Sequence, residues 1–415
     1  MLDLRIGLLL GLRQIRHASL WTTILIITVV VFTFLNLVAV SGILTGIVDG
    51  ALKSTRDEAV SDVAFEPHGG EKRILHTDQL IKELKDYNEV EGVSARYTGI
   101  ATLEANYKER RDLNAEPDVI TTTITGIDIA DENSVTHLGS IIGECYYFDP
   151  KESGYIILGK YTIDRYADKF GDAFQYLDGI EPGDTVRVTA HSRTEEFIVK
   201  GIIDSKIDIV SLKIFLPERE FRRLFDRPDY DANSVLVRAK EGYTDKALKD
   251  VLVEHGYLKY GKISTFTEGM PSFIQDVITT FDILGAFVGL IGITVASITV
   301  FIVIFINALS RKRQIGILKA IGISERAIEY AYLSQAAFYA VIGATLGVLI
   351  TVFLLVPYFR ENPIDFPYGD TSLSISALGV ALRCLLLFGI MIVAGYFPAW
   401  LITRQNTLNS ILGRK

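Results

Sequence analysis

Four long runs of uncharged and mostly apolar residues limit what this chain can fold into. They cover residues 18–48, 283–310, 330–359 and 373–403, and only Arg383 interrupts the last run. A helix needs about 20 apolar residues to cross the roughly 30 Å hydrocarbon core of a bilayer. The sequence therefore predicts a membrane protein with four transmembrane α-helices. Charged residues still make up 22% of the chain, so a large part of it is expected to lie outside the membrane.

The first run follows several arginines, as a secretory signal would, but it is too long to be a signal. It has 31 residues, whereas the apolar part of a signal peptide has about 7 to 15. We interpret it as an uncleaved membrane anchor. As a helix it would be about 46 Å long, so its surplus length is expected to project from the bilayer as a stalk.

Basic residues near the ends of the runs predict the orientation of the chain. They form three groups: Arg5, Arg13 and Arg16; Arg311, Lys312, Arg313, Lys319 and Arg326; and Arg404, Arg414 and Lys415. All three groups fall on one side of the membrane, and the positive-inside rule makes this the cytoplasmic side. We therefore expect a multi-pass protein of the cytoplasmic membrane with both termini in the cytoplasm.

The resulting layout alternates between the membrane and the two aqueous sides. The predicted parts are a cytoplasmic N-terminus at 1–17, a first span with its stalk at 18–48, an extracytoplasmic domain at 49–276, a second span at 277–310, a cytoplasmic segment at 311–327, a third span at 328–357, an external loop at 358–376, a fourth span at 377–403 and a cytoplasmic tail at 404–415. A large domain is thus inserted between the first and the second span.

The inserted domain is acidic and mixes strand and helix patterns. It holds about 29 basic and about 43 acidic residues, which gives no reason to expect a nucleic-acid partner. Its apolar period switches between two and about 3.6, which is typical of an α+β fold. Two similar orders of strand, helix and strand are expected: 61–67, 76–87 and 91–105, and then 233–239, 243–256 and 262–268.

Local signals refine these elements. Thr77 or Asp78 is the candidate N-cap of the first helix, and Gly256 is expected to close the second. The first order should end in a pair of strands at 91–105.

Residues 150–225 predict an inserted small β subdomain, with a short helix beginning at Pro217. Within it, 154–161 matches the spacing of a phosphate-binding loop, but Tyr161 stands where the loop needs serine or threonine. The residues between its glycines are apolar, so we interpret this stretch as a buried strand. We find no metal-binding helix motif or nucleophile elbow, and we expect no active site, cofactor or metal on this chain.

The sequence RKRQIGILKAIGISERA at 311–327 carries the strongest signal for a binding surface. Its apolar residues lie on or near one face of a helix: Ile315, Ile317, Leu318 and Ile321. Gly316 and Gly322 each weaken an isolated helix by about 1 kcal/mol relative to alanine, so the segment is expected to need a partner surface. The residues alone leave two partners open, which are anionic lipid and a groove in another protein.

This segment and the span after it resemble the MacB/FtsX-like family of ABC transporter permeases. The family shares a core of a basic residue, any residue, Ile-Gly-Ile-Leu, a basic residue, Ala, any residue and Gly. In this chain the core consists of Arg313, Ile315, Gly316, Ile317, Leu318, Lys319, Ala320 and Gly322. The order of one span, a large domain and three further spans is also similar, as are segments 157–170 and 181–188.

The resemblance implies that 311–327 is a coupling helix seated in a groove of a separate ABC-type ATPase subunit, which would bind the ATP and magnesium. Ile317, Leu318 and Ile321 would fill that groove. The basic residues would set the position of the helix against the ATPase or lipid head groups: Arg311, Lys312, Arg313 and Lys319. A complete complex would hold two permeases, identical or different, and two ATPases. The chain itself would be non-catalytic.

Two functions are compatible with the resemblance. In the first, ATP hydrolysis moves the extracytoplasmic domain and exports or extracts a hydrophobic, peptide or lipid-linked substrate, with a periplasmic adaptor as a further partner. In the alternative, the same motion activates an extracytoplasmic enzyme and nothing is transported. The tail at 404–415 lacks the proline that relatives often have there, which weakens the expectation of a tail contact with the ATPase.

Small and charged residues in the spans predict helix contacts. Two glycine pairs have the four-residue spacing that lets helices approach closely, within one chain or between two permeases: Gly285 with Gly289, and Gly343 with Gly347. Asp282 and Arg383 are a candidate intramembrane ion pair, because a lone charge at mid-bilayer costs about 2.5 to 3.5 kcal/mol. The alternative is that each charge reaches the membrane interface independently.

Overall fold

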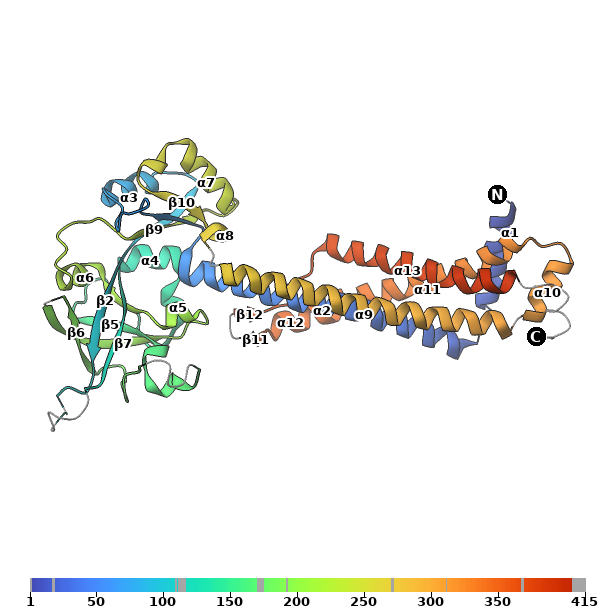
Figure 1. Ribbon diagram of the computed structural model, residues 1–415, viewed down its shortest axis with the longest axis horizontal. Helices are drawn as coiled ribbons and strands as arrows, with labels where there is room; N and C mark the ends of the chain where they lie inside the picture. The colour runs from blue at the N-terminus through green and yellow to red at the C-terminus, as the bar shows by residue number, and fades with distance from the viewer. Residues whose placement is uncertain are drawn as a thin grey trace. The chain divides into compact units, whose positions relative to one another are not determined.

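The computed structural model describes residues 2–16, 19–108, 110, 117–169, 175–191, 193–269, 272–310, 312–366 and 369–404. These residues form two compact units, one helical and one built on a sheet (Figure 1). The sheet unit comprises the described residues of 50–275 together with Gly369, and the helical unit comprises the other described residues. Each unit has its own hydrophobic core.

The helical unit contains long helices that run alongside one another and shorter ones between them (Figure 1). Its helices are α1 (Leu2–Arg16), α2 (Leu20–Thr55), α9 (Ser272–Ser310), α10 (Lys312–Ala320), α11 (Glu325–Ile350), α12 (Val356–Glu361) and α13 (Ala377–Thr403). A π-helical stretch, Thr351–Leu355, continues α11 into α12. The strands β11 (Ile364–Phe366) and β12 (Gly369–Thr371) pair with each other.

Within the described residues, four helical stretches are long and apolar enough to cross a membrane. They are Leu20–Val60, Gln275–Ser310, Glu325–Glu361 and Ala377–Leu401. These stretches overlap the four predicted spans. The first has 41 residues and would be about 60 Å long as a helix, which exceeds the thickness of a bilayer core. It therefore has the surplus length that a stalk requires.

An additional helix, α1, precedes the first of these stretches. The sequence analysis assigned no secondary structure to residues 1–17, whereas Leu2–Arg16 forms a helix that packs closely on α11. A side chain at Gly7 would overlap Tyr330, and one at Gly11 would overlap Ser334, so this close approach depends on glycine. Four leucines of α1 stay exposed: Leu4, Leu8, Leu9 and Leu12.

The sheet unit is built on one ten-stranded sheet with the order β10-β1-β9-β2-β3-β8-β5-β7-β4, in which β6 pairs with β2 and β7. The strands are β1 (Val63–Glu66), β2 (Val90–Glu104), β3 (Val119–Ile127), β4 (Ile142–Cys145), β5 (Tyr155–Gly159), β6 (Thr185–Ala190), β7 (Arg193–Ile203), β8 (Ile214–Pro217), β9 (Ser234–Ala239) and β10 (Lys262–Thr265). Most neighbours are antiparallel, but β3 with β8 and β5 with β7 are parallel.

Short helices accompany the sheet (Figure 1). They are α3 (Thr77–Lys85), α4 (Ile129–Thr136), α5 (Asp208–Ser211), α6 (Glu218–Leu224), α7 (Asp245–Glu254) and α8 (Phe266–Gly269). Both predicted orders of strand, helix and strand form. Their strands interleave in the sheet, because β1 and β2 of the first order alternate with β10 and β9 of the second. The two segments therefore share one core.

The predicted pair of strands at 91–105 is wrong, because this stretch forms the single 15-residue strand β2. It pairs with β9 along its first half and with β3 along its second half. Gly99 is not a turn residue here. A side chain at Gly99 would overlap the ring of Phe225, and one at Gly126 on β3 would overlap Phe221. Glycine at these positions makes room for α6 to pack on the sheet.

The caps of the helices differ in part from the prediction. Neither Thr77 nor Asp78 caps α3, because His76 holds the N-cap position with no side-chain cap bond. The Thr77 hydroxyl instead donates to the carbonyl of Ile74 and accepts from the backbone N–H of Ala232, at 2.7 and 3.0 Å. Gly256 ends α7 with a φ of 79°, as predicted.

The strands of 150–225 join the same sheet as their neighbours in sequence. β6 pairs with β2, and β8 pairs with β3, so hydrogen bonds cross both borders of this segment. The helix predicted at Pro217 is confirmed, since α6 begins at the next residue. The stretch 154–161 contains β5, and its residues Ile156, Ile157 and Leu158 are fully buried. This confirms a buried strand in place of a phosphate-binding loop.

Candidate functional site

The basic segment forms the short helix α10, which Gly322 terminates. The backbone N–H of Ile323 donates to the carbonyl of Leu318, and that of Gly322 donates to the carbonyl of Lys319, both at 3.1 Å. These two bonds and the φ of +93° at Gly322 make up a Schellman motif. A glycine expected to weaken the helix therefore ends it. Arg311 and the side chain of Lys312 lie outside the described residues.

The apolar residues of α10 divide into an inner and an outer set. Ile315 is 3% exposed and belongs to the helical core, and Leu318 is half-buried against that core. Ile317 and Ile321 are 49% and 70% exposed, and they stand four residues apart. Gly316 is buried as well. The exposed apolar surface at α10 thus consists of two isoleucines, Ile317 on the helix and Ile321 directly after its last residue, and Leu318 packs on the inner side.

Lys319 ties α10 to other helices of the same chain. Its ammonium donates to the carbonyl of Thr403 at 2.7 Å and pairs with the carboxylate of Glu325 at 2.6 Å. A cation at the last carbonyls of α13 is favourable because it offsets the negative end of the helix dipole. Lys319 therefore positions α10 internally, whereas Arg313 is exposed and carries no such contact within the described residues.

Polar contacts also join α1 to the start of α11. Ser324 caps α11 by accepting from the N–H of Ala327 at 3.2 Å, and its hydroxyl donates to Asp3 at 2.7 Å. At the other end of α1, Gln335 donates to Gln14. Polar contacts thus link α10 to α11 and α13, and α1 to α11.

The glycine pairs of the spans lie at contacts within the chain. A side chain at Gly343 would overlap Val30, and one at Gly347 would overlap Phe34, so α11 packs tightly on α2. Gly285 and Gly289 on α9 also face α2, where added Cβ atoms would lie 3.4 Å from Leu44 and 3.6 Å from Leu37, the distance of ordinary contact. Only the α11 pair therefore requires glycine for its packing.

Asp282 and Arg383 line one cavity of about 390 Å³ between α2, α9 and α13. The guanidinium of Arg383 donates to the hydroxyl of Ser41 at 2.6 Å. No ion pair joins the two charges directly among the described residues, and Ser41 accepts one hydrogen bond from Arg383. The pairing of Asp282 with Arg383 stays a prediction.

A second set of residues, which the sequence analysis missed, fixes the end of α2 in the sheet unit. A π-helical turn, Arg56–Val60, follows α2, and we call this turn the stalk base. Its residues are held by strands and loops: Asp57 pairs with Arg238 of β9 at 2.8 Å, Glu58 accepts from Ser205 at 2.6 Å, Arg56 pairs with Asp62 at 2.7 Å, and the carbonyl of Ala59 accepts from Arg96 of β2 at 2.5 Å.

Arg96 and Glu132 form a buried ion pair beneath the stalk base. Ser94 donates to the same carboxylate at 2.7 Å, and the hydroxyl of Thr136 also contacts it. Burial alone would raise the pKa of Glu132, but Arg96 and these hydroxyls hold the pKa below its usual value. Nearby, burial and the charge of Arg96 lower the pKa of Lys213 to about 8.

The sequence contained one signal for this set. Arg96 is the one charge in an otherwise uncharged and largely buried stretch of β2, and a charge at such a position needs a partner. The partner could not be identified, because Glu132 lies on α4 and only the fold brings it to β2. No group of His, Cys, Asp or Glu side chains suited to a metal is found in the part of the chain that the structure describes.

Comparison with protein families matches both units. The model of the MacB-like periplasmic core domain matches residues 21–254, and the model of the FtsX-like permease C-terminal region matches residues 286–407. The two solved structures below are similar at a level too low to support an argument. The periplasmic region of MacB from Actinobacillus actinomycetemcomitans has a TM-score of 0.35 and 14% identity, covering 55% of this chain and 97% of that chain. The extracellular domain of the ABC-type transporter YknZ from Gram-positive bacteria has a TM-score of 0.33 and 15% identity, covering 49% and 97%.

Curated relatives include two proteins named macrolide export ATP-binding/permease protein. MacB 1 of Yersinia pestis bv. Antiqua (strain Antiqua) is 30% identical over 208 residues, which is 48% of this chain and 30% of the relative. MacB of Campylobacter jejuni subsp. jejuni is 26% identical over 227 residues, which is 52% of this chain and 34% of the relative. The similarity thus spans about a third of the length of these relatives.

Proposed function

This chain belongs to the MacB-type ABC transporter permease family, with a MacB-like periplasmic core domain and an FtsX-like C-terminal region, and we propose that it transmits the work of a separate ABC-type ATPase to its sheet unit. In this proposal α10 is the coupling helix, and the ATPase partner binds the ATP and magnesium. The permease acts as one of a pair, identical or different. It is a multi-pass protein of the cytoplasmic membrane with both termini in the cytoplasm.

One observation carries the proposal. Ile317 and Ile321 expose apolar surface on a helix whose other side is fastened to the helical core by Ile315, Leu318 and Lys319. Burying the exposed fractions of these two side chains in a partner is worth roughly 2 to 4 kcal/mol before the costs of association. A small apolar surface on a firmly held helix suits an ATPase subunit that must bind it and transmit force to it in every cycle. The exposed Arg313, together with Arg311, would set its register against the ATPase or lipid head groups.

The stalk base supports the second half of the proposed path. Because α2 continues without a break into the turn at Arg56–Val60, a displacement of α2 is carried along the helix to residues held by β2 and β9. Side chains on both strands bind the turn. A displacement of the turn should therefore move the sheet with it. The moved sheet unit would export or extract a hydrophobic, peptide or lipid-linked substrate, with an adaptor as a further partner.

The same stalk base favours the second candidate function. A mechanotransmitter needs a firm connection between membrane helices and an outer domain, and it needs no path for substrate. In that case the sheet unit would activate an extracytoplasmic enzyme. The two functions share the coupling step, and they separate by what binds the sheet unit: a small hydrophobic or lipid-linked molecule, or a hydrolase.

The coupling step can be tested with the double variant Ile317→Asp, Ile321→Asp. The full chain and its ABC-type ATPase are reconstituted in vesicles, and the stimulation of ATP hydrolysis by the permease is measured. We expect at least a tenfold loss of stimulation, because two charges would enter an apolar groove. Ile209→Asp is the matched control, since Ile209 is 56% exposed on the sheet unit. Stimulation equal to that of the control would exclude α10 as the coupling surface.

A further inference from the structure

The sheet unit carries a cavity lined mainly by arginine, which neither the coupling surface nor the stalk base explains. It has a volume of about 630 Å³ and lies at α6 and the loop that leads to β9. Five arginines line it together with a single acid, Asp226: Arg193, Arg219, Arg222, Arg223 and Arg227. The domain as a whole has more acidic than basic residues, so a cavity lined by five arginines suggests a specific role for positive charge at this place.

Three of these arginines are held in place by acidic partners. Arg223 forms two hydrogen bonds to the carboxylate of Glu195, at 2.6 and 3.0 Å. Arg193 donates to Asp226 at 2.6 Å. The third, Arg222, donates to Glu218 at 2.9 Å, and its guanidinium stacks at 3.6 Å over the ring of Tyr230, which also lines the cavity. These contacts fix the positions of the three guanidinium groups that form one wall of the cavity.

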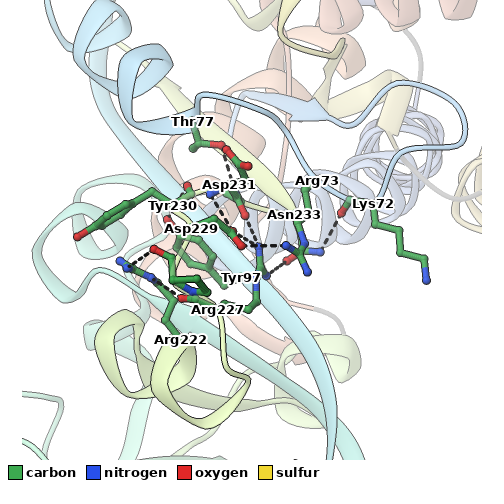
Figure 2. A network of polar contacts seen from close by, with 12 residues as sticks. Lys72, Arg73, Thr77, Tyr97, Arg222, Arg227, Asp229, Tyr230, Asp231 and Asn233 are labelled. Atoms are coloured by element: carbon green, nitrogen blue, oxygen red, sulfur yellow. Dashed lines mark hydrogen bonds and ion pairs between the residues drawn. The ribbon is translucent and has the colours of Figure 1, made fainter. Parts of the chain in front are cut away.

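The other two arginines retain donors that the chain does not use. Arg219 is exposed and makes no hydrogen bond or ion pair among the described residues. The side chain of Arg227 is only 7% exposed, and its Nε is buried without a partner. Its terminal nitrogens donate to Asn233, Asp229 and the carbonyl of Asp231, which Figure 2 shows gathered around it. Because this Nε is closed to solvent, Arg227 contributes its positive charge to the wall, and the accessible unused donors belong to Arg219.

The surroundings of Arg227 favour an anion at this wall. Burial lowers the pKa of Arg227, and repulsion from Arg73 lowers it further, although Asp229 opposes both. Arg73 itself reaches the same carboxylate, at 3.0 Å, so one acid is shared by two arginines (Figure 2). Added negative charge would relieve this excess of cations.

We propose that this cavity binds an oxyanion of the phosphate class, carried by a small molecule or by a lipid head group, with the exposed Arg219 as the contacting residue and the buried charge of Arg227 behind the wall. Phosphate fits better than carboxylate because it carries about 1.5 to 2 negative charges and several acceptor oxygens. A forked guanidinium matches those oxygens in pairs. The volume leaves room for a substituent beside the phosphate, against the exposed ring of Tyr230. This inference does not depend on the ATPase, so its failure would leave the coupling proposal intact.

The test uses the purified full chain in a non-ionic detergent free of phospholipid. Isothermal titration calorimetry measures the binding of two probes, inorganic phosphate and glycerophosphoglycerol, at low ionic strength. Arg219→Ala is the informative variant, because Arg219 is exposed and has no hydrogen-bond or ion-pair partner in the part of the chain that the structure describes. Lys246→Ala is the matched control, since it removes one exposed positive charge from α7, away from the cavity. We expect Arg219→Ala to weaken binding roughly tenfold or more and Lys246→Ala to leave it unchanged.

The outcomes separate the sources of the anion. Saturable binding of both probes that depends on Arg219 supports the site with free phosphate as a sufficient ligand. Binding of glycerophosphoglycerol alone, with the same dependence, supports it with a lipid head group as the source. The proposal is overturned if neither probe saturates, or if the two variants bind equally well. It is also overturned if a hexaglutamate peptide binds more tightly than both probes, because the cavity would then be a docking site for an acidic protein segment.

Discussion

Helix α10, the coupling helix of the proposed function, and the stalk base are held by different kinds of contact. α10 keeps two isoleucines exposed and fastens itself with Lys319, a half-buried leucine and a glycine stop. The stalk base keeps no comparable apolar surface among its described residues. It is held instead by ion pairs and hydrogen bonds, with Arg96 and Glu132 buried beneath it.

This difference follows from what each contact has to survive. A surface that docks to a separate chain must be stable while it is uncovered, and exposed isoleucines cost the folded chain little. A joint that carries force within one chain can stay closed throughout. Hydrogen bonds and ion pairs fix the geometry of such a joint. The cost of removing their charged groups from water arises only once, when the chain folds. We therefore expect loss of a charge near the stalk base to lower stability. Substitution of the exposed isoleucines of α10 should instead affect mainly the stimulation of the ATPase.

The largest effect is expected for Glu132→Gln. The amide removes the charge that compensates Arg96, so the free energy of unfolding of the sheet unit should fall by about 3–5 kcal/mol. Hydrogen exchange of β2 and β9 amides in the full chain measures this loss. Glu144→Gln is the control, because the pair of Glu144 with Arg165 is partly exposed and worth at most about 1 kcal/mol. Equal effects of the two variants would show that burial of the pair does not matter.

Lys213→Met should raise the free energy of unfolding, and the size of this increase should depend on pH. The pKa of Lys213 is about 8 in the fold and 10.5 in the unfolded chain, so between these values the unfolded chain binds more protons. Stability of the native protein should therefore rise with pH across this window. Methionine removes the buried charge, which should stabilise the sheet unit by up to about 3 kcal/mol at pH 7, with a gain that vanishes towards pH 10.5. A gain independent of pH would refute this origin.

A smaller effect is expected for Gly322→Ala, which tests the glycine stop. Alanine in this left-handed conformation costs about 1–2 kcal/mol, so the amides of α10 should exchange hydrogen roughly 5- to 30-fold faster. Gly389→Ala on α13 is the control, because a Cβ there meets open space in an ordinary helical backbone. If the amides of α10 exchange at the same rate in both variants, the Schellman motif does not stabilise the C-terminal end of the helix.

The smallest effect on stability is expected for the double variant Ile317→Asp, Ile321→Asp. Both side chains are exposed, so the helical unit should keep its free energy of unfolding within about 0.5 kcal/mol even though stimulation of the ATPase is lost. Leu318→Asp provides the contrast, because it places a charge against the helical core and should destabilise the unit. Thermal unfolding in detergent compares the three proteins. A large loss for the isoleucine variant would mean that these residues serve the fold.

Much of the architecture could be predicted because its signals are local. Apolar runs predicted four long helices, and alternation with caps predicted β1, α3, β9, α6 and α7. The errors arose where one residue type serves two purposes. Residues 91–105 suggested two strands, yet they form one, in which Gly99 makes room for Phe225. Thr77 suggested a cap, yet it binds the loop before β9. Both roles depend on residues more than 120 positions away in the chain.

The sequence by itself determined that long apolar helices alternate with an acidic mixed domain, and that a basic, isoleucine-rich segment lies between two of them, because length, period and charge act over neighbouring residues. Only the tertiary structure decided which isoleucines stay exposed, that Lys319 turns inward, and that Arg96 meets Glu132 under the turn at the end of α2. Those outcomes depend on which surfaces the fold brings together, and burial and pairing energies are set by that proximity and not by order along the chain.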